Sequence, residues 1–318
     1  MKVLILGGSG FVGSHLTRRL AREGHQVTVA TRYAPGCKHL WVVPQATIRQ
    51  FDPFDPEALT EELRGHDVAI NLIGILNERG RGGAGFRRVH VELVETIIDA
   101  CVAAGVPHLV QMSGLNAGRG ESHYLRTRGE GEARVRAAQR DGRLVGTILR
   151  ASTIFGPGDS FLNRFTGLLK LSPVLPMARP NAKFAPVFVD DVVEAFLRVL
   201  LDEDNAGRVY ELCGSEEWSL IDIVRWQRDQ LELRRLVVGL PDSLARLQGL
   251  IFDFVPGKPF SSDNYKSLKL DSVCESNGFK KLGIRPWGLA ERATRMLKPT
   301  DKQSRYRQFR RQARRERG

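Results

Sequence analysis

The stretch KVLILGGSGFVGSHL, residues 2–16, decides the fold, because a short apolar run ends there in a cluster of glycines. Val3–Leu6 has the length and composition of a buried strand. Val12, Leu16 and Leu20 then recur every four residues, which is the spacing of one helix face. The glycines therefore lie in the turn that joins a strand to a helix.

Gly7, Gly10 and Gly13 have the GxxGxxG spacing of loops that bind the pyrophosphate of a dinucleotide. Gly7 would permit the tight turn, Gly10 would let the backbone approach the pyrophosphate, and Gly13 would let the helix pack closely on the strand. The first N–H groups of the helix, together with the helix dipole, would hold the anion. The alternative is a glycine-rich turn that binds nothing.

The rest of the first half repeats the alternation of strand and helix. Predicted strands cover residues 27–31, 47–50, 68–73, 109–112 and 145–149, and predicted helices cover 56–63, 89–101 and 124–139. Strands that alternate with helices form a parallel sheet with helices on both faces. The sequence therefore predicts an α/β fold, a doubly wound parallel sheet of the Rossmann type. Beyond residue 155 prolines are frequent and the alternation loosens, which predicts a smaller C-terminal α+β lobe.

We expect the chain to have three parts. Residues 1–155 form the dinucleotide-binding Rossmann domain, to which residues 184–212 return, residues 156–297 form the smaller substrate or partner lobe, and residues 298–318 form a basic, disordered tail. The tail carries nine Lys/Arg and two Asp/Glu, which leaves only +5 of the net charge of +12 for residues 1–297. Such a tail could attach to anionic lipid or nucleic acid, although runs of this kind more often only solubilise a chain. We expect no specific nucleic-acid partner.

Composition excludes several classes of protein. Hydrophobic residues at 42% and charged residues at 26% are near globular averages, which excludes a disordered or fibrous chain. No apolar run reaches the roughly 18–20 residues of a membrane-spanning helix. The cysteines show neither metal-ligand spacing nor a dense framework, so we expect no metal site and a reducing compartment, the cytoplasm. They are Cys37, Cys101, Cys213 and Cys274.

The end of the second strand selects the cofactor. NAD sites usually carry a carboxylate there for the ribose diol, whereas an arginine accommodates the 2′-phosphate of NADP. This chain offers Thr31 and Arg32 and no carboxylate nearby, so NADP (NADPH) is favoured over NAD. The alternative is that Arg32 is an ordinary solvated cation at a strand end.

Together with three downstream segments, these motifs resemble the extended short-chain dehydrogenase/reductases of the NAD-dependent epimerase/dehydratase superfamily. The segments are Asn71-Leu72-Ile73-Gly74, Ser113 followed by Tyr124, and LRASTIFGPGD at residues 149–159, in which Ala151 stands where proline is usual. From residue 1 to about residue 297 the chain is similar to an atypical branch of that family. This branch contains the NADPH-binding accessory subunit of respiratory complex I and its bacterial relatives. The narrower likeness lies in residues 71–78, 86–92, 124–132, 155–165, 186–191 and 260–273.

The resemblance implies roles for individual residues. Ser9, Gly10, Phe11 and Val12 would wrap the pyrophosphate. Asp52 would reach the adenine, and Ile73 and Gly74 would line the adenosine ribose. Ala151, Thr153 and Ile154 would approach the nicotinamide. Asp52 has a second interpretation, because an Asp-Pro pair also initiates a turn.

In active members of that family a tyrosine is the general acid, a lysine four residues later lowers its pKa, and a serine positions the substrate oxygen. The resemblance assigns two of these roles to Tyr124 and Ser113, but the third position holds Arg128, and residues 39–169 contain no lysine. A phenol with a pKa of about 10 needs a neighbouring cation to act at neutral pH. Arginine is bulkier and planar, and it is hydrated differently from lysine. Either Arg128 supports slow hydride chemistry, or the site retains the dinucleotide with little turnover.

Two functions remain open. We favour a protein that holds its cofactor mainly for structure or sensing, with weak or no turnover and, by the resemblance, a link to respiratory or quinone metabolism. The alternative is an NADP-dependent oxidoreductase, epimerase or dehydratase that uses Tyr124 on a sugar-nucleotide or bulky carbonyl substrate. The partner besides the dinucleotide is an unknown small-molecule substrate or protein. A third possibility is that the protein makes a peripheral contact with the inner membrane face.

Three further features carry expectations. The arginine-flanked loop 80–85 is either an anionic-substrate contact or a solvated loop, and His90 is expected to pack or to form hydrogen bonds. An amphipathic helix is expected to contribute to the core of the smaller lobe, with a surface for a membrane, a quinone-like ligand or a protein as the alternative. Its apolar residues are Leu240, Leu244, Leu247, Ile251 and Phe254.

Overall fold

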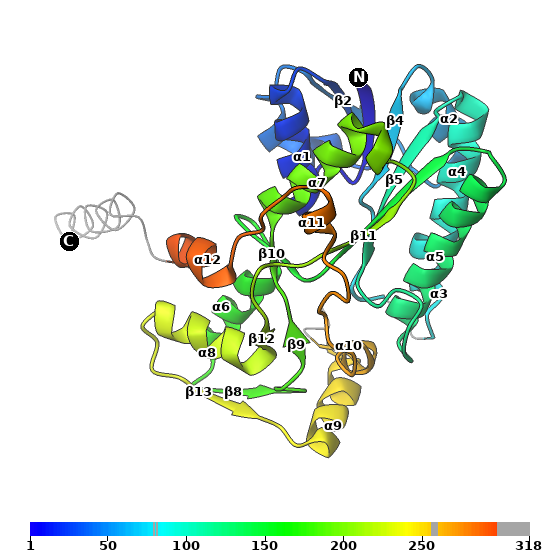
Figure 1. Cartoon of the computed structure of the whole chain (residues 1–318). Helices are drawn as coiled ribbons and strands as arrows, with labels where there is room; N and C mark the ends of the chain where they lie inside the picture. Colours follow the sequence, from blue (N-terminus) through cyan, green and yellow to red (C-terminus); the bar gives the residue numbers. More distant parts are fainter. Residues whose placement is uncertain (79, 81, 256–259, 298–318) are drawn as a thin grey trace, which may run out of the picture.

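The computed structural model describes residues 1–78, 80, 82–255 and 260–297 (Figure 1). Its centre is a seven-stranded sheet in the order β11-β6-β5-β4-β1-β2-β3. The strands are β1 (Lys2–Leu6), β2 (Gln26–Thr31), β3 (Ala46–Gln50), β4 (Val68–Asn71), β5 (His108–Gly114), β6 (Val145–Ala151) and β11 (Val209–Leu212). All neighbours in this sheet pair in parallel, which confirms the predicted fold class.

Helices cover both faces of the sheet. α1 (Phe11–Arg22) and α7 (Val189–Leu201) lie together on one face, and α2 (Pro56–Leu63), α4 (Leu93–Ala104) and α5 (His123–Arg140) lie on the other. Successive side chains of a strand point to opposite faces, so Ile5 belongs to the first apolar core while Leu4 and Leu6 belong to the second. Burial on both faces explains why the strand reads as an unbroken apolar run.

The strand order reverses at β1, which has β2 on one side and β4 on the other. In sheets of this kind the crevice outside the carboxyl ends of the strands at such a reversal is where ligands bind. The glycine-rich turn after β1 and the segments after β4, β5 and β6 all open onto this edge (Figure 1).

Two predicted elements end or begin elsewhere. β4 stops at Asn71, two residues before the predicted end, because the Asn71 Oδ1 accepts the N–H of Ile73 at 3.0 Å and turns the chain. The helix predicted from residue 89 begins earlier, as α3 (Ala84–Arg87), and passes through a π-helical turn (Arg88–Glu92) into α4.

The smaller lobe is built from short elements around a third apolar core. α6 (Phe161–Leu171) packs against α8 (Leu220–Gln230), and β8 (Val174–Met177) pairs with β13 (Leu236–Gly239). The other paired segments are β7 (Ile154–Phe155) with β10 (Val187–Phe188) and β9 (Lys183–Phe184) with β12 (Trp218–Ser219). The remaining helices are α9 (Asp242–Phe252), α10 (Ser262–Ser267), α11 (Gly278–Lys281) and α12 (Leu289–Leu297). The predicted tail, 298–318, lies outside the described residues.

The expectation that the apolar residues of α9 and its flanks belong to the core is wrong for most of them. Leu244, Leu247, Ile251 and Phe254 are 49, 50, 54 and 76% exposed, and Leu240 alone of the five is packed against buried residues. The physical reason is that α9 turns its small residues inward. Ala245 and Gly249 are the buried residues of the helix.

Cys213, just after β11, forms a disulfide with Cys274, and their Cα atoms are 6.0 Å apart. The two cysteines are 61 residues apart in sequence, so no local motif predicts the disulfide. The argument from scattered cysteines to a reducing compartment therefore fails for this pair. Cys37 and Cys101 are free and buried.

Candidate functional site

The turn between β1 and α1 is held in shape by its glycines. Gly7 has φ +80°, a conformation that L side chains rarely adopt, and its carbonyl accepts the N–H of Gly10 at 3.0 Å. A Cβ on Gly13 would lie 2.3 Å from the Gly7 oxygen, so only glycine allows this close approach of helix and turn. Gly10 is exposed and precedes the helix.

The start of α1 fits a pyrophosphate. The helix has no acidic residue in its first turn and no side-chain cap. The N–H groups of Phe11, Val12 and Gly13 have no acceptor in the described part of the chain, whereas the Ser14 N–H donates to Gly10. Unpaired N–H groups at a helix start, with the positive end of the helix dipole, form a site for an anion. Ser9, Phe11 and Val12 are half-buried at the rim of this site.

The residues expected at the adenosine end lie at the ends of β2 and β3. Arg32 is exposed directly after β2, where no carboxylate is adjacent. Asp52 is exposed after β3, and one of its oxygens accepts the N–H of Phe54 at 3.2 Å. This contact is the turn that the second interpretation of Asp52 anticipated.

The chain after β4 lies directly beside the glycine turn. A Cβ on Gly7 would lie 3.2 Å from the backbone of Ile73, which brings these two predicted residues together. The fully buried Asn71 amide donates to Gln111 Oε1 at 2.9 Å, and the Gln111 amide donates to the carbonyl of Met112 at 2.8 Å. These two successive hydrogen bonds fix the ends of β4 and β5 relative to each other.

Ser113, Tyr124 and Arg128 are brought together where β5 ends. A Cβ on Gly114 would lie 3.1 Å from the Tyr124 hydroxyl, so the hydroxyl sits against the backbone next to Ser113. The Ser113 hydroxyl is buried and has no hydrogen-bond partner among the described residues. A buried polar atom without a partner costs free energy, and a substrate oxygen at this point would supply the missing hydrogen bond.

Arg128 is held by the same edge of the sheet. Its Nη1 donates to the Met112 carbonyl at 3.1 Å, and its guanidinium carbon lies 5.5 Å from the centre of the Tyr124 ring. A Cβ on Gly74 would lie 2.0 Å from Nη2, so the guanidinium occupies the space that a side chain at residue 74 would need. The Nε of Arg128 is buried without a partner in the described chain.

His90 is a hydrogen-bonding group behind the tyrosine. Its Nε2 accepts the N–H of Ile75 at 3.3 Å, so the proton is on Nδ1, which donates to the Thr127 hydroxyl at 3.0 Å. Burial, aided by the charge of Arg128, lowers the His90 pKa to about 2, so the ring is neutral. The expectation of a packing and hydrogen-bonding role agrees with this geometry.

The residues that follow β6 lie next to this group. Gly114 of β5 pairs with Ala151 of β6, which is buried at the position where the family pattern has proline. The Thr153 carbonyl accepts the N–H of Val187 at 3.0 Å, and Ile154 begins β7. Thr153 and Ile154 thus lie one strand away from Ser113.

Three anchors hold the tyrosine helix, and a local pattern exists only for the first, a serine at the helix start. The Ser122 hydroxyl caps α5 by accepting the N–H of Leu125 at 3.1 Å. Glu132, 1% exposed, binds Arg150 of β6 through contacts of 2.6–3.1 Å. Asp263 of α10 accepts the N–H groups of His123 and Tyr124 at 2.6 and 3.1 Å.

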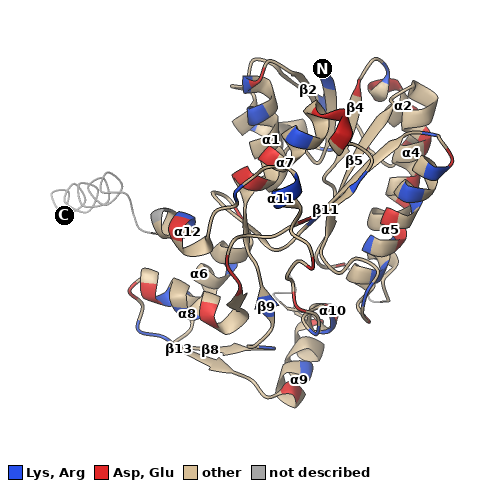
Figure 2. Ribbon diagram, in the orientation of Figure 1, with Lys and Arg blue, Asp and Glu red and all other residues tan. Residues whose placement is uncertain are grey.

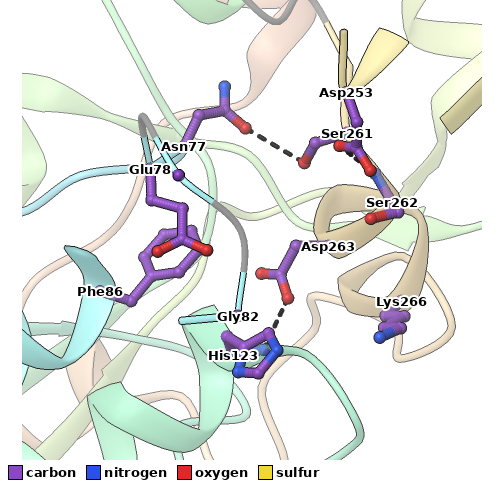
Figure 3. Close-up of a pocket in the computed structure, with 11 residues that line it drawn as sticks. Asn77, Glu78, Gly82, Phe86, His123, Asp253, Ser261, Ser262, Asp263 and Lys266 are labelled. Carbon is purple, nitrogen blue, oxygen red and sulfur yellow. Dashed lines mark hydrogen bonds between the residues drawn. The ribbon is translucent and has the colours of Figure 1, made fainter. Parts of the chain in front are cut away.

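A cavity of about 200 Å³ lies between the loop after β4 and α10 (Figure 3). Glu78 and Phe86 point into it from one side, and Asp263 and Lys266 lie across it. The Glu78 carboxylate accepts the N–H groups of Gly83 and Gly85 at 2.8 and 2.9 Å, which pins part of the glycine-rich loop. The other lining residues are Asn77, Gly80, Gly82, His123, Asp253, Ser261 and Ser262.

Comparison with known proteins identifies the family of the chain. Residues 3–213 match the model of the NAD dependent epimerase/dehydratase family. The chain belongs to this family. Structures of a dTDP-glucose 4,6-dehydratase from Streptomyces venezuelae and a UDP-glucose 4-epimerase from Thermotoga maritima share the fold, with TM-scores of 0.74 and 0.72 and identities of 20 and 18%. They cover 93 and 90% of this chain, and 96 and 94% of theirs.

The curated relatives include subunits of NADH dehydrogenases and a reductase. The 40 kDa subunit of NADH-ubiquinone oxidoreductase from Neurospora crassa is 27% identical over 90% of this chain and 76% of its own length. Subunit 9 of the 1 alpha subcomplex of mouse NADH dehydrogenase [ubiquinone] is 26% identical over 92% of this chain and 79% of its own. A ceramide reductase from Caulobacter vibrioides is 28% identical over 71% of this chain and 65% of its own.

No described helix combines the length and the apolar character needed to cross a membrane. In the same part of the chain no group of His, Cys, Asp or Glu side chains is arranged to hold a metal ion.

Proposed function

We propose that this protein binds NADP(H) at the β1–α1 turn and holds it mainly for structure or sensing, with weak or no turnover. The observation that carries the proposal is Arg128. The guanidinium lies over the face of the Tyr124 ring and is tied to the Met112 carbonyl. A cation placed on the ring face and shared with a carbonyl stabilises a phenolate less than a compact ammonium at the hydroxyl.

The cofactor would be held by the residues whose geometry fits it. The free N–H groups of Phe11, Val12 and Gly13 would bind the pyrophosphate, with Gly10 allowing its approach. Ile73 and Gly74 would face the adenosine ribose, and Ala151, Thr153 and Ile154 would face the nicotinamide. A bound nicotinamide would supply a hydride, and Tyr124 would supply the proton.

The preference for NADP over NAD is part of the proposal. Arg32 is exposed at the end of β2, and no adjacent carboxylate there would repel a 2′-phosphate. Asp52, with one oxygen engaged by Phe54, has its second oxygen available for the adenine. We also propose a link to respiratory or quinone metabolism and a peripheral contact with a membrane. The relatives that are named as subunits of a ubiquinone-reducing complex support this link.

A second candidate is an NADP-dependent oxidoreductase, epimerase or dehydratase on a bulky carbonyl or sugar-nucleotide substrate. The observation that favours it is the buried Ser113 hydroxyl, which has no partner in the described chain and lies beside the Tyr124 hydroxyl. The relative named ceramide reductase supports a bulky, lipid-like carbonyl.

The deciding experiment has two parts. Mass spectrometry of nucleotide released from the denatured protein should detect NADP(H), and calorimetry should show NADPH binding about tenfold or more tightly than NADH. Arg32→Ala should remove that difference, while Arg22→Ala, which replaces another exposed arginine at the end of α1, should keep it. No heat with either dinucleotide would overturn the proposal.

Turnover separates the two candidates. With excess NADPH and a panel of long-chain ketones and sugar nucleotides, the wild type and Tyr124→Phe should consume NADPH at the same background rate. Arg128→Lys should raise the rate above that background. Rapid wild-type consumption that Tyr124→Phe abolishes would instead establish the second candidate.

A further inference from the structure

The exposed side of α9 and the turn that follows it carry a stripe of large apolar side chains. Leu244, Leu247, Leu250, Ile251 and Phe254, here called the α9 apolar face, recur at steps of three and four residues and are 48–76% exposed. At 100° per residue these five side chains fall within a stripe of roughly 120°, the width with which a helix usually faces a core. On α9 this stripe faces outward.

The inner side of α9 shows why the helix cannot simply rotate. The Gly249 backbone lies so close to α10 that a Cβ there would be 3.2 Å from the Cα of Ser262. Ala245 is fully buried beside it, and Gln248 reaches the Pro176 carbonyl of β8 at 3.4 Å. Only small residues fit this contact, so the large apolar residues stay outside.

The charges near the α9 apolar face are few, and the one charged residue between the two ends of the helix is basic. The carboxylates at the two ends of the helix are engaged: Asp242 binds Arg179 at 2.9 Å and the Tyr265 hydroxyl at 2.7 Å, and Asp253 accepts the N–H of Ser262 at 3.1 Å. Between them the only charged residue is Arg246, which is exposed at the border of the stripe.

Other exposed helices look different. The outer surfaces of α4 and α5 carry mixed charges (Figure 2), with ion pairs such as Arg134–Glu95 at 2.8 Å and Arg143–Asp99 at 2.7 Å. Those surfaces are suited to water. α9 is mostly uncharged in the same view and lies at the outer end of the smaller lobe, where a flat surface can reach it (Figures 1 and 2).

We infer that the α9 apolar face docks on the surface of an anionic phospholipid bilayer. A single helix of eleven residues offers several hundred Å² of apolar surface, less than the roughly 800 Å² per partner of a stable protein interface. A helix that inserts one apolar side into the headgroup boundary, beside a basic residue, needs no more than this. The inference names the surface that makes the peripheral membrane contact of the proposed function. It rests on the proposed function for that membrane contact and not for the cofactor.

The docking surface adjoins the cavity. Asp253, directly after α9, lines the cavity with Ser262 and Lys266 of α10, and His123 next to Tyr124 lines its opposite side. A bilayer on the α9 apolar face therefore lies beside a cavity whose opposite side is lined by His123, the residue before Tyr124.

The test is flotation of the full chain with vesicles of phosphatidylcholine alone and with 3:1 phosphatidylcholine and phosphatidylglycerol (about one anionic lipid in four). The wild type should float with the anionic vesicles and remain partly bound in 0.5 M salt (roughly 3–5 Å screening length), where purely electrostatic attachment of the basic tail is suppressed. The double variant Leu247→Glu/Phe254→Glu should lose about tenfold or more of the bound fraction at high salt. Leu201→Glu, a 59% exposed leucine at the end of α7, is the matched control and should float like the wild type.

Three outcomes would overturn the inference. The first is that the wild type does not float, and the second is that the double variant floats as well as the wild type. The third is that light scattering finds the wild type as a dimer and the double variant as a monomer, which would make the face a contact between two copies. NADPH binding by calorimetry is measured on every variant and should be unchanged. Failure of docking with intact NADPH binding thus leaves the cofactor proposal standing, and loss of NADPH binding by the wild type would affect that proposal alone.

Discussion

Replacing Gly74 by alanine tests whether Arg128 occupies the space that the structure assigns to it. The new Cβ would lie 2.0 Å from Nη2 and 3.0 Å from Cζ, so the guanidinium must leave. Its hydrogen bond to the Met112 carbonyl is then lost, which costs about 1.5–3 kcal/mol for a charged donor. The guanidinium is the far end of a flexible side chain, so its displacement adds little beyond the loss of that hydrogen bond. We expect Gly74→Ala to lower the free energy of unfolding by about 1.5–3 kcal/mol.

The same substitution in an Arg128→Lys background should behave differently. Lysine carries no planar head at that point, so the methyl group meets open space, and replacing glycine by alanine then restricts the unfolded chain. We expect a change between zero and about 1 kcal/mol in favour of the folded state. The coupling energy between residues 74 and 128 should therefore reach about 1.5–4 kcal/mol.

Urea unfolding of the four proteins, followed by far-ultraviolet circular dichroism, measures this cycle. The decisive quantity is the difference between the two Gly74→Ala effects. If alanine costs the same in both backgrounds to within about 0.5 kcal/mol, the guanidinium does not lie against Gly74 and the geometry of the site is wrong.

Three other predictions follow from buried contacts. Gly13→Ala puts a methyl group 2.3 Å from the Gly7 oxygen, so the turn must open, and NADPH should no longer raise the melting temperature; retained protection by NADPH would contradict this. Glu132→Ala leaves the partly buried Arg150 with Glu211, 3.7 Å away, as its carboxylate partner and should cost about 1.5–3 kcal/mol in urea unfolding, whereas a cost below about 1 kcal/mol would show the pair to be solvated. Burial raises the Asp191 pKa to about 6, so the folded state binds the extra proton and the stability from this group falls as pH rises from about 4 to 6. Asp191→Asn should therefore gain about 2 kcal/mol relative to the wild type between pH 4.5 and 7, and a difference independent of pH would refute the assignment.

Local periodicity predicted the sheet because each strand and helix of a doubly wound fold shows its hydrophobic pattern within about ten consecutive residues. The run from Val3 to Leu20 contains a strand, a glycine turn and a helix face, and all three are present in the structure. The same local signal could not say which way α9 faces. Its apolar spacing is that of a core helix, and the outcome depends on Ala245 and Gly249 meeting α10, which is a fact of packing and not of pattern.

Contacts between distant segments were beyond the sequence for the same reason. Asp263 reaches the start of α5 across about 140 residues, and Cys213 reaches Cys274 across 61. An aspartate near a serine predicts at most a local cap. The residues assigned to the cofactor and to the tyrosine chemistry stay predictions, although the structure gathers Ser113, Tyr124 and Arg128 at one strand end.

The grip of Asp263 on α5 has a mechanical consequence. The carboxylate holds the first two amides of the tyrosine helix at 2.6 and 3.1 Å, and a shift of α10 by about 1 Å takes both beyond hydrogen-bonding range. The α9–α10 arm and the amino end of α5 therefore move as one body or separate all at once. Any force that displaces the α9–α10 arm therefore loosens the start of α5 and with it the Tyr124 side chain. The position of the arm at the tip of the smaller lobe is thus coupled to the placement of the phenol at the end of β5.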